Sequence, residues 1–401
     1  MNLENITKSD NEIDLNFFLS FFIRNKKVIS LFSNIGIAET YLKEIGFEIL
    51  LANDICKKRI NIFSKFYPDT IPIHGDFSER KIFNQIVKIS RDLKPDIILA
   101  TPPCQGMSTA GEQKKNDFRN NLTVNLVEYI KVIKPKYIFL ENVPLFLKTS
   151  IMVNNKKILI RDFIKNELCN TYTINSEIVD MSNFSIPQKR LRTIILLSKK
   201  TLSREWKLPK KDKKIISLKD AIGSLPSLDP YIKDLSIEEN RKIFPEYEKK
   251  KENGLKVSKW HKPPHHLKRH VISMMHTPTG SSAFSNKFHK PLKTNGEIVR
   301  GYKNTYKRQS WDIPAYTVTM DNVKISSQEN VHPGRKIGEN NFGKNIYSDP
   351  RVFSLYELMI ISSLPKSWDI PEKISESFLR RLIGEGIPPL FVKKVFNELI
   401  T

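Results

Sequence analysis

Residues 96–105 read Asp-Ile-Ile-Leu-Ala-Thr-Pro-Pro-Cys-Gln. The apolar run at 96–100 predicts a buried β-strand, and the two prolines after it predict a stiff turn that leads to Cys104. In α/β proteins, reactive groups gather at the carboxyl ends of buried strands. This stretch therefore predicts an α/β fold with a cysteine at its active edge.

Two further apolar runs are each adjacent in the sequence to polar residues that also suit an active site. Residues 137–140 form an expected strand that leads into Glu141-Asn142-Val143, and Gln188-Lys189-Arg190-Leu191-Arg192 leads into an expected strand at 193–197. A thiol, a carboxyl group and two guanidinium groups, each at the edge of a strand, suit an enzyme that attacks a polarised ring.

Short apolar strands alternate with amphipathic helices from residue 28 to residue 197, which predicts βαβ units and a mostly parallel, doubly wound α/β sheet. From residue 199 the chain becomes rich in lysine and is interrupted by prolines, so we place a domain boundary there. The expected strands are 28–32, 48–52, 71–74, 96–100, 137–140, 174–179 and 193–197, and helices are expected at 355–363 and twice within 375–400.

The net charge of +23 over 401 residues indicates a polyanionic partner. Nucleic acid is a better candidate than a membrane surface, because no basic amphipathic helix stands out. A lysine-rich coding bias is the alternative explanation for part of this charge. The hydrophobic share of 39% and the charged share of 27% are typical of a soluble globular protein, and the length suggests two domains.

The cysteines and one apolar segment bear on the location of the protein. Cys56, Cys104 and Cys169 are widely spaced, which fits neither a disulfide framework nor a metal site and indicates a reducing compartment. Residues 15–23 are apolar but too short to span a bilayer, so we expect a packed helix there. We expect a cytoplasmic protein with no membrane attachment.

Three short motifs occur in a fixed order, each beside an expected strand: Pro-Cys-Gln at 103–105, Glu-Asn-Val at 141–143 and Gln-x-Arg-x-Arg at 188–192. In form and order they resemble the motifs of the DNA cytosine-5 methyltransferases of bacterial restriction-modification systems. The resemblance is close over residues 28–198 and looser over residues 306–401. It implies an S-adenosylmethionine-dependent methyltransferase fold with a smaller, irregular target-recognition domain, and double-stranded DNA as the substrate.

The resemblance also implies how the chain is divided. Residues 1–198 would form the catalytic and cofactor-binding domain, completed by residues 376–401. Residues 199–375 would hold the target-recognition region and a segment that supports it. Near the end of the chain, Gly-Glu-Gly-Ile-Pro at 384–388 resembles the family's Gly-Asn-Ser-Val-Pro, with Glu385 and Gly386 as departures.

The turn after the first strand resembles the family's Phe-x-Gly-x-Gly-Gly, which contacts S-adenosylmethionine. Phe32 and Gly36 match this pattern, whereas Asn34 and Ile37 replace two of its glycines. Because asparagine tolerates a positive φ, position 34 can keep the turn, while Ile37 narrows the space for the cofactor. The alternative is that this strand–helix turn only packs within the fold and does not contact a cofactor.

Acidic residues after the second and third strands complete the expected cofactor site. Asp54 could accept hydrogen bonds from ribose hydroxyls, and Asp76 from the adenine amino group. Both match acidic positions that hold the cofactor in the family. We add Phe77, beside Asp76, and Leu122, which matches a family position that packs on the cofactor. The alternative role for each acid is to cap the helix that follows.

The candidate catalytic residues suit methyl transfer to a carbon that is a poor nucleophile. Attack by the Cys104 thiolate on C6 of cytosine would let C5 take the methyl group. Glu141, as a carboxylic acid, would bind N3. Arg190 and Arg192 would hold the base carbonyl, the substrate phosphate or Glu141 itself. The target base would have to leave the helix stack, so base flipping is implied.

Substrate contacts are expected from Gln105, Ser108 and Asn142. Each candidate catalytic residue has a plainer alternative. The cysteine could be an inert buried thiol, the glutamate a surface carboxylate, and the arginines solvated charges.

The recognition region contains a histidine-rich stretch with His261, His265, His266, His270 and His276. A zinc site is the alternative here, but no cysteine or acidic ligand accompanies the histidines. Contacts to phosphates and bases are the preferred interpretation, and we expect no metal.

The resemblance implies an enzyme that modifies a specific duplex sequence and protects host DNA from a partner restriction endonuclease, and we expect this enzyme to be a monomer. One alternative is a tRNA cytosine-5 methyltransferase of the same family. Another is a catalytically inactive DNA-binding protein on the same fold. The long basic region after residue 199 favours duplex DNA, and the intact motif residues favour an active enzyme.

Overall fold

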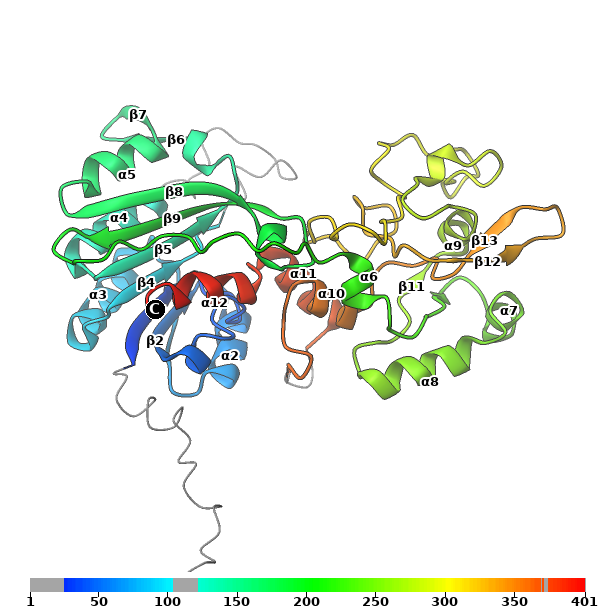
Figure 1. The fold of residues 1–401 in the computed structure, drawn as a ribbon, viewed down its shortest axis with the longest axis horizontal. Coiled ribbons are helices and arrows are strands. Elements are labelled where there is room, and N and C mark those ends of the chain that lie inside the picture. Colours follow the sequence, from blue (N-terminus) through cyan, green and yellow to red (C-terminus); the bar gives the residue numbers. More distant parts are fainter. Residues whose placement is uncertain (1–24, 104–121, 369, 371–373, 401) are drawn as a thin grey trace, which may run out of the picture.

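The computed structural model describes residues 25–103, 122–368, 370 and 374–400. Cys104, Gln105, Ser108 and the apolar stretch at 15–23 lie outside the described residues. Figure 1 shows a lobe built on a central sheet, a second lobe of short elements and long connections, and a group of helices between the two. No helix in the described part of the chain is long and apolar enough to cross a bilayer.

The first lobe is built on a seven-stranded sheet in the order β3-β2-β1-β4-β5-β9-β8. Strands β1 to β5 are parallel, and β9 runs antiparallel to both of its neighbours, β5 and β8. The strands are β1 (Lys26–Leu31), β2 (Phe47–Asp54), β3 (Ile71–His74), β4 (Ile97–Ala100), β5 (Tyr137–Asn142), β8 (Tyr172–Asp180) and β9 (Leu191–Lys199). All seven predicted strands are present, and the predicted mostly parallel α/β sheet is confirmed.

Helices cover both faces of this sheet, because neighbouring residues of the central strands point to opposite sides and are apolar on both. Ile29 and Ile98 belong to the core beneath α3, α4 and α5. Val28 and Ile97 belong to the core beneath α2 and α12. The helices are α2 (Lys57–Phe66), α3 (Arg80–Leu93), α4 (Leu122–Ile133), α5 (Ile160–Leu168) and α12 (Pro389–Asn397). The last helix of the chain thus completes the first lobe.

A β-hairpin between β5 and α5 was not predicted. Its strands β6 (Ser150–Val153) and β7 (Lys156–Leu159) pair in antiparallel fashion. Asn154 and Asn155 both have positive φ, as a tight two-residue hairpin turn requires. Short 3-10 helices are η1 (Lys43–Ile45), η3 (Phe146–Lys148), η4 (Met181–Phe184) and η5 (Ala283–Ser285).

The start of the lysine-rich segment packs on the sheet lobe, so the change of composition at residue 199 does not coincide with a change of lobe. Trp206 is fully buried in the same core as α12, and its indole Nε1 donates to the carbonyl of Val395 at 2.8 Å. Its ring meets those of Tyr137 and Phe396 edge-on. One tryptophan thus holds this stretch of charged chain against the sheet.

The helices between the lobes are α6 (Leu218–Ile222), α10 (Leu355–Ile361) and α11 (Glu376–Glu385). They share one apolar core with Ile35 and Ile37 of the turn after β1 and with Ile62 of α2. Phe66 of α2 also stacks on Trp368, with ring centroids 5.1 Å apart. This core joins the turn after β1 and helix α2 of the sheet lobe to α6, α10 and α11.

The second lobe has little regular structure and small apolar cores. A hairpin, β12 and β13, projects at its far end (Figure 1). Its elements are β10 (Tyr231–Ile232), α7 (Ile237–Ile243), α8 (Tyr247–Val257), β11 (His265–His266), α9 (Lys268–Met275), β12 (Lys336–Glu339) and β13 (Asn345–Tyr347). The expectation of an irregular second domain agrees with this architecture.

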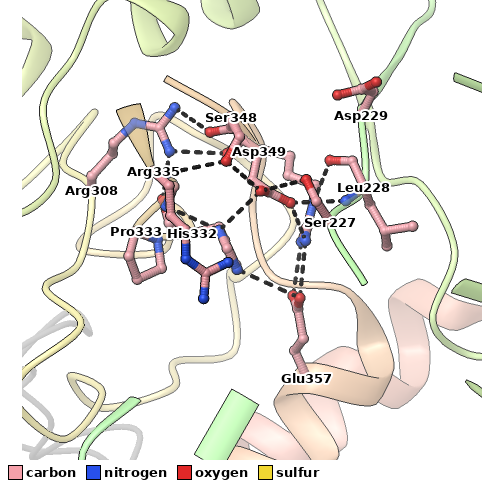
Figure 2. Close-up of polar contacts among 12 residues, drawn as sticks. Ser227, Leu228, Asp229, Arg308, His332, Pro333, Arg335, Ser348, Asp349 and Glu357 are labelled. Atoms are coloured by element: carbon pink, nitrogen blue, oxygen red, sulfur yellow. Dashed lines mark hydrogen bonds and ion pairs between the residues drawn. The ribbon is translucent and has the colours of Figure 1, made fainter. Parts of the chain in front are cut away.

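A network of buried charged groups connects the second lobe to α10 (Figure 2). Arg351 donates to both carboxylate oxygens of Glu357, at 2.8 and 2.9 Å, and to Asp349 at 2.7 Å. His332 lies 3.7 Å from Glu357 and 4.0 Å from Asp349. Arg308 is fully buried and donates to main-chain carbonyls, among them that of Asp349 at 3.0 Å.

The network keeps its carboxylates charged and its histidine neutral. Burial disfavours the charged form of Glu357, yet Arg351 and His332 hold its pKa down to about 2. Burial lowers the pKa of His332 to about 4. Asp349 also accepts from the Ser227 hydroxyl, so the network ties residue 227 to residues 349–357. Each of these buried groups finds its hydrogen-bond or ion-pair partner within the network. The lobe therefore depends on one specific arrangement of these side chains.

The preferred interpretation of the histidine-rich stretch is wrong for two of its members. His261 is fully buried, and its ring nitrogens lie 2.9 Å from the Ser354 hydroxyl and 2.9 Å from the Pro226 carbonyl. His266 is also buried and accepts from the Val352 N–H at 3.2 Å. Neither side chain faces solvent, so neither can contact a phosphate or a base in this arrangement.

Candidate active site

A cleft of about 1450 Å³ lies at the carboxyl ends of the central strands, where the turn after β1 meets the second lobe. Strand ends at this edge carry the predicted site residues. The described residues that line the cleft include 32–34, 101–103, 141–145, 189–192, 316–321, 326–329 and 384–387. Residues 316–320, which lie within the range 199–375 expected to hold the recognition region and its supporting segment, are therefore themselves part of the wall of the site.

The predicted catalytic carboxylate is paired with one of the two predicted arginines. Glu141 lies in β5 and Arg192 in the neighbouring β9, and Arg192 Nε donates to Glu141 Oε1 at 2.8 Å. The two side chains are only 10% and 14% exposed, so water screens their interaction weakly. A second Arg192 nitrogen donates to the carbonyl of Leu191 at 2.7 Å, which fixes the guanidinium plane.

Arg190 has different contacts, although it also lines the cleft. Its guanidinium is buried and donates to the main-chain carbonyls of Val318 and Gly384, each at 3.1 Å. Gln188 behaves similarly, since its side-chain oxygen accepts from the Val318 N–H at 3.1 Å. Glu141 was one of the partners expected for the two arginines, and it is bound by Arg192. Arg190 instead joins three separate segments of the cleft wall.

Asn142 braces the segment that leads to Cys104. Its side-chain nitrogen donates to the carbonyl of Pro102 at 3.1 Å, and its side-chain oxygen accepts from Val143 N at 2.8 Å. Pro102 and Pro103 both line the cleft. The last described residue before Cys104 therefore lies in the cleft wall. Asn142, expected to bind substrate, thus holds Pro102, two residues before Cys104 in the sequence.

The turn after β1 has the backbone conformation that its glycine-rich relatives would need. Phe32, Asn34 and Gly36 all have positive φ, at 60°, 55° and 88°. A Cβ on Gly36 would lie 2.1 Å from the Tyr67 ring, whose hydroxyl donates to the Gly36 carbonyl at 2.6 Å. Gly36 is therefore required both for its conformation and for its close approach to Tyr67. Asn34 keeps the turn without a glycine, as predicted from its tolerance of positive φ.

Phe32 exposes part of its ring to the cleft and meets Phe77 edge-on, with centroids 5.5 Å apart. Phe77 itself is buried in the core and packs on Tyr129. Phe77 and Leu122, both predicted to bind cofactor, are buried and are not among the described residues that line the cleft.

Asp54 lies at the end of β2 and lines the cleft. Its two oxygens accept from Cys56 N at 2.8 Å and from Asn34 N at 3.0 Å. Burial raises the pKa of Asp54, while these amide hydrogen bonds and the Arg59 guanidinium act in the opposite direction. The carboxylate thus holds the turn that leads into α2 through the N–H of Cys56, although it does not cap the helix itself, and it still offers acceptor capacity to the cleft.

Asp76 has a local role in the described structure. One of its oxygens accepts from both the N–H and the hydroxyl of Ser78, at 2.8 and 2.7 Å, just before α3 begins. Asp76 is not among the described residues that line the cleft. Its contact with adenine therefore stays a prediction.

Sequence reasoning missed several residues of the cleft. Ile55, directly after Asp54, is 63% exposed and offers an apolar surface beside the expected ribose site. Arg59 and Glu385 form an ion pair at 2.6 Å within the lining. The only available signal was position: Ile55 follows a strand end, Arg59 lies within the first helical turn after it, and Glu385 departs from the family motif.

The residues present fit S-adenosylmethionine. The cofactor carries hydrogen-bond donors in its ribose hydroxyls, adenine amino group and ammonium group, and the cleft offers acceptors. Asp54 is one, and the side-chain oxygen of Asn34 is another, since it is buried and has no hydrogen-bond partner in the described structure. Such an unpaired acceptor is costly unless a ligand or water satisfies it. Phe32 and Ile55 supply apolar surface.

In the described residues, no three histidine, cysteine or acidic side chains come together in a way that could hold a metal ion.

Comparisons with known proteins agree with this geometry. The family model of the C-5 cytosine-specific DNA methylases matches residues 26–401. Type II methyltransferase M1.HgaI of Avibacterium volantium is 40% identical over 381 residues, which cover 94% of this chain and 98% of that protein. Type II methyltransferase M.HindV of Haemophilus influenzae is 28% identical over 222 residues, 54% of this chain and 69% of that protein.

A solved structure supports the fold. The crystal structure of a prophage-encoded protein of E. coli, described as a DNA modification methyltransferase, matches with a TM-score of 0.62 at 20% identity, over 94% of this chain and 98% of that one. The family match extends over nearly the whole chain and includes every motif that lines the cleft. The chain therefore belongs to the C-5 cytosine-specific DNA methylases, whose methyl donor is S-adenosylmethionine, and is a DNA cytosine-5 methyltransferase.

Proposed function

We propose that this enzyme methylates carbon 5 of one cytosine within a specific double-stranded DNA sequence, by covalent attack of Cys104 on C6 of a flipped base. One observation carries the proposal. Glu141, paired with Arg192 at 2.8 Å, lines the same cleft as Pro102 and Pro103, which lead directly to Cys104. The arrangement brings an acid and a cation to the same cleft wall as Pro103, the residue before Cys104 in the sequence.

The residues divide the chemistry between them. The Cys104 thiolate forms a bond to C6, and Glu141 gives a proton or hydrogen bond to N3, so that electron density reaches C5. Bound S-adenosylmethionine supplies the methyl group as an electrophile. C5 then loses its proton to a general base, the S–C6 bond breaks, the thiolate is released, and N3 returns its proton to Glu141. Arg192 holds Glu141 in place and can also donate to the base carbonyl.

The cofactor would lie along the turn after β1. We assign direct contacts to Phe32, Asn34 and Asp54, which line the cleft. For Gly36, Asp76, Phe77 and Leu122, which are not among the described residues that line it, a role in binding the cofactor stays a prediction from the family resemblance. Support is strongest for Asp54 and for Asn34, whose buried side-chain oxygen has no described partner. Gly36 would act by shaping the turn, since a Cβ at this position would meet the ring of Tyr67.

The rim of the cleft suits a nucleic acid. Tyr302 is 81% exposed, and Arg300 and Lys303 beside it in the sequence are exposed as well. The carbonyl of Tyr302 accepts from both the N–H and the hydroxyl of Thr305, which lines the cleft, so the turn is rigidly held at the rim. An exposed ring between two cations can stack on a base while its neighbours bind phosphates.

We infer duplex DNA as substrate, with Gln105 and Ser108 among the groups that contact it. The net charge of +23 and the relatives named as type II methyltransferases support this inference. In that setting the enzyme acts in the cytoplasm, as a monomer, and protects host DNA from a partner endonuclease. The tRNA alternative requires a folded single-stranded target.

Three measurements test the proposal. Bisulfite sequencing of DNA from cells that express the enzyme should reveal one methylated sequence, and Cys104→Ala should abolish methylation while DNA binding remains. Duplex containing 5-fluorocytosine should trap a covalent adduct, because fluorine cannot leave as a cation. In one buffer, tritiated methyl groups should enter duplex DNA and not total tRNA. Preferential labelling of tRNA would instead establish the alternative.

A further inference from the structure

The departures of this chain from its family's cofactor motifs come together at one place. Asn34 and Ile37 lie in the turn after β1, and Glu385 and Gly386 lie at the end of α11, more than 300 residues later. The Asn34 side chain donates to the carbonyl of Leu382 at 3.4 Å. A Cβ on Gly386 would lie 2.9 Å from Ile37 Cγ2. Two segments that each differ from the family pattern therefore contact one another.

An ion pair adds α2 to this part of the cleft wall. Arg59 Nη2 of α2 lies 2.6 Å from Glu385 Oε2, and the two side chains are only 21% and 16% exposed. The other carboxylate oxygen of Glu385 accepts from Arg381 Nε at 3.1 Å. The Glu385 carboxylate is thus held from both sides, by α2 and by its own helix.

Arg59 also acts on the expected ribose acceptor. Its guanidinium favours the charged form of Asp54, whereas Glu385 disfavours it. The remaining groups that act on Asp54 are the N–H groups of Asn34 and Cys56. Arg59 is therefore the cation that acts on both carboxylates of the cofactor wall.

Stability alone does not account for such a pair. A largely buried ion pair gains little over apolar packing, because desolvation offsets the attraction. What it supplies is a fixed geometry between two elements that are distant in sequence. Here the elements are the helix that begins beside Asp54 and the segment 384–387 that lines the cleft.

We propose that Arg59 and Glu385 form a positioning pair for the methyl donor, one that holds Asp54 toward the cofactor ribose and keeps residues 384–387 closed against the cofactor. This inference rests on the proposed cofactor site. The pair acts through Asp54 and the cleft wall, so its loss affects cofactor affinity before it affects the chemistry on the base.

Calorimetric titration of the full-length enzyme with S-adenosylmethionine, without DNA, tests the pair. Glu385→Gln and Arg59→Met should each weaken binding by about tenfold, the scale of one lost buried polar contact. The single-turnover rate at saturating cofactor should change by less than about twofold. The matched control is Glu44→Gln. It removes the 2.7 Å pair between Glu44 and Lys393 of α12, which also ties the C-terminal segment to the sheet lobe but is more exposed. This control should bind like wild type.

The pH dependence of affinity separates positioning from simple bracing. Loss of the Arg59 charge should raise the pKa of Asp54, so that on acidification Arg59→Met loses affinity at a higher pH than wild type. Arg59→Lys keeps a cation. Its affinity should therefore fall at the same acidic pH as that of wild type, even if the affinity itself is lower. The inference would be overturned if the affinity of Arg59→Met fell at the same acidic pH as that of wild type. It would also be overturned if both Arg59→Met and Glu385→Gln bound S-adenosylmethionine with wild-type affinity. Failure of the wild-type enzyme to bind S-adenosylmethionine would instead count against the proposed cofactor site itself.

Discussion

Arg192 of β9 donates through Nε to the Oε1 atom of Glu141 in β5, at 2.8 Å, and both side chains are largely buried. The register of the antiparallel pair makes this contact possible, because Glu141 lies opposite Ile194 and Asn142 opposite Thr193. The residue before Thr193 therefore extends past the end of β5 and can reach back to the carboxylate. The reversed direction of β9 thus brings a cation to the edge where the parallel strands end.

This pair predicts how the enzyme fails when the acid is removed. Glu141→Gln keeps the shape of the side chain but cannot deliver a proton to N3, so the single-turnover rate of methyl transfer should fall by about 10²- to 10⁴-fold. Cofactor affinity should stay within about twofold of the wild-type value. The control is Glu177→Gln, because Glu177 of β8 lies opposite Ile194 on the other side of β9 and is exposed. Equal losses in both variants would contradict the assigned role.

The contact between Ile37 and Gly386 predicts coupled substitutions. Gly386→Ala should weaken S-adenosylmethionine binding by about 1–2 kcal/mol, because its Cβ would meet Ile37 at 2.9 Å and push the two segments apart. Ile37→Ala removes the obstructing atoms, so the double variant should recover most of that loss. A double-mutant cycle of cofactor affinities measures the coupling. Gly338→Ala is the control, since no atom lies within 4 Å of the added carbon. Strictly additive effects at 37 and 386 would refute the coupling.

Exposed rings at two places on the second lobe predict different effects on DNA binding. Tyr302→Ala should cost about 1–3 kcal/mol of duplex affinity, the usual value for a lost base–aromatic contact, and Tyr302→Phe should cost much less. Phe342 is equally exposed, at 83%, but lies in the connection of the β12–β13 hairpin at the far end of the lobe (Figure 1). Phe342→Ala should therefore bind like wild type. Fluorescence anisotropy at fixed salt gives the comparison, and equal losses at 302 and 342 would show that the cleft rim has no special role.

Buried neutral histidines predict a loss of stability in acid. Burial lowers the pKa of His332 to about 4 and that of His266 to about 3, against an ordinary value of 6.5. Below pH 6.5 the unfolded chain takes up protons that the folded chain refuses, so stability is full above pH 6.5 and falls as the pH decreases towards 4. Each histidine should cost about 2 kcal/mol of unfolding free energy at pH 5 relative to pH 7.5.

Urea denaturation at pH 7.5 and pH 5.0 checks this prediction. His332→Gln should reduce the difference between the two unfolding free energies, whatever its effect at a single pH. Replacement of the exposed His74 by glutamine should leave the difference unchanged. The same difference in wild type and His332→Gln would mean that His332 is not the group that refuses the proton.

The sequence by itself determined the sheet and the edge at which the site lies. Apolar strands that alternate with amphipathic helices are local patterns, and the central strands are apolar on both faces because helices cover both. The motifs at 103–105, 141–143 and 188–192 each lie at a strand end, and strand ends meet by the rules of the fold. The turn after β1 was predictable for the same reason, since the backbone preference of Asn34 is a local property.

Tertiary structure alone decided which of these side chains touch. Arg190 and Arg192 are two residues apart and identical in type, yet one binds two distant segments, at 318 and 384, and the other binds Glu141. The histidines of the second lobe were assigned to the surface because a run of polar residues carries no mark of its burial, which depends on partners such as Ser354. The contact between Arg59 and Glu385 joins elements 326 residues apart, through a packing that no local preference encodes.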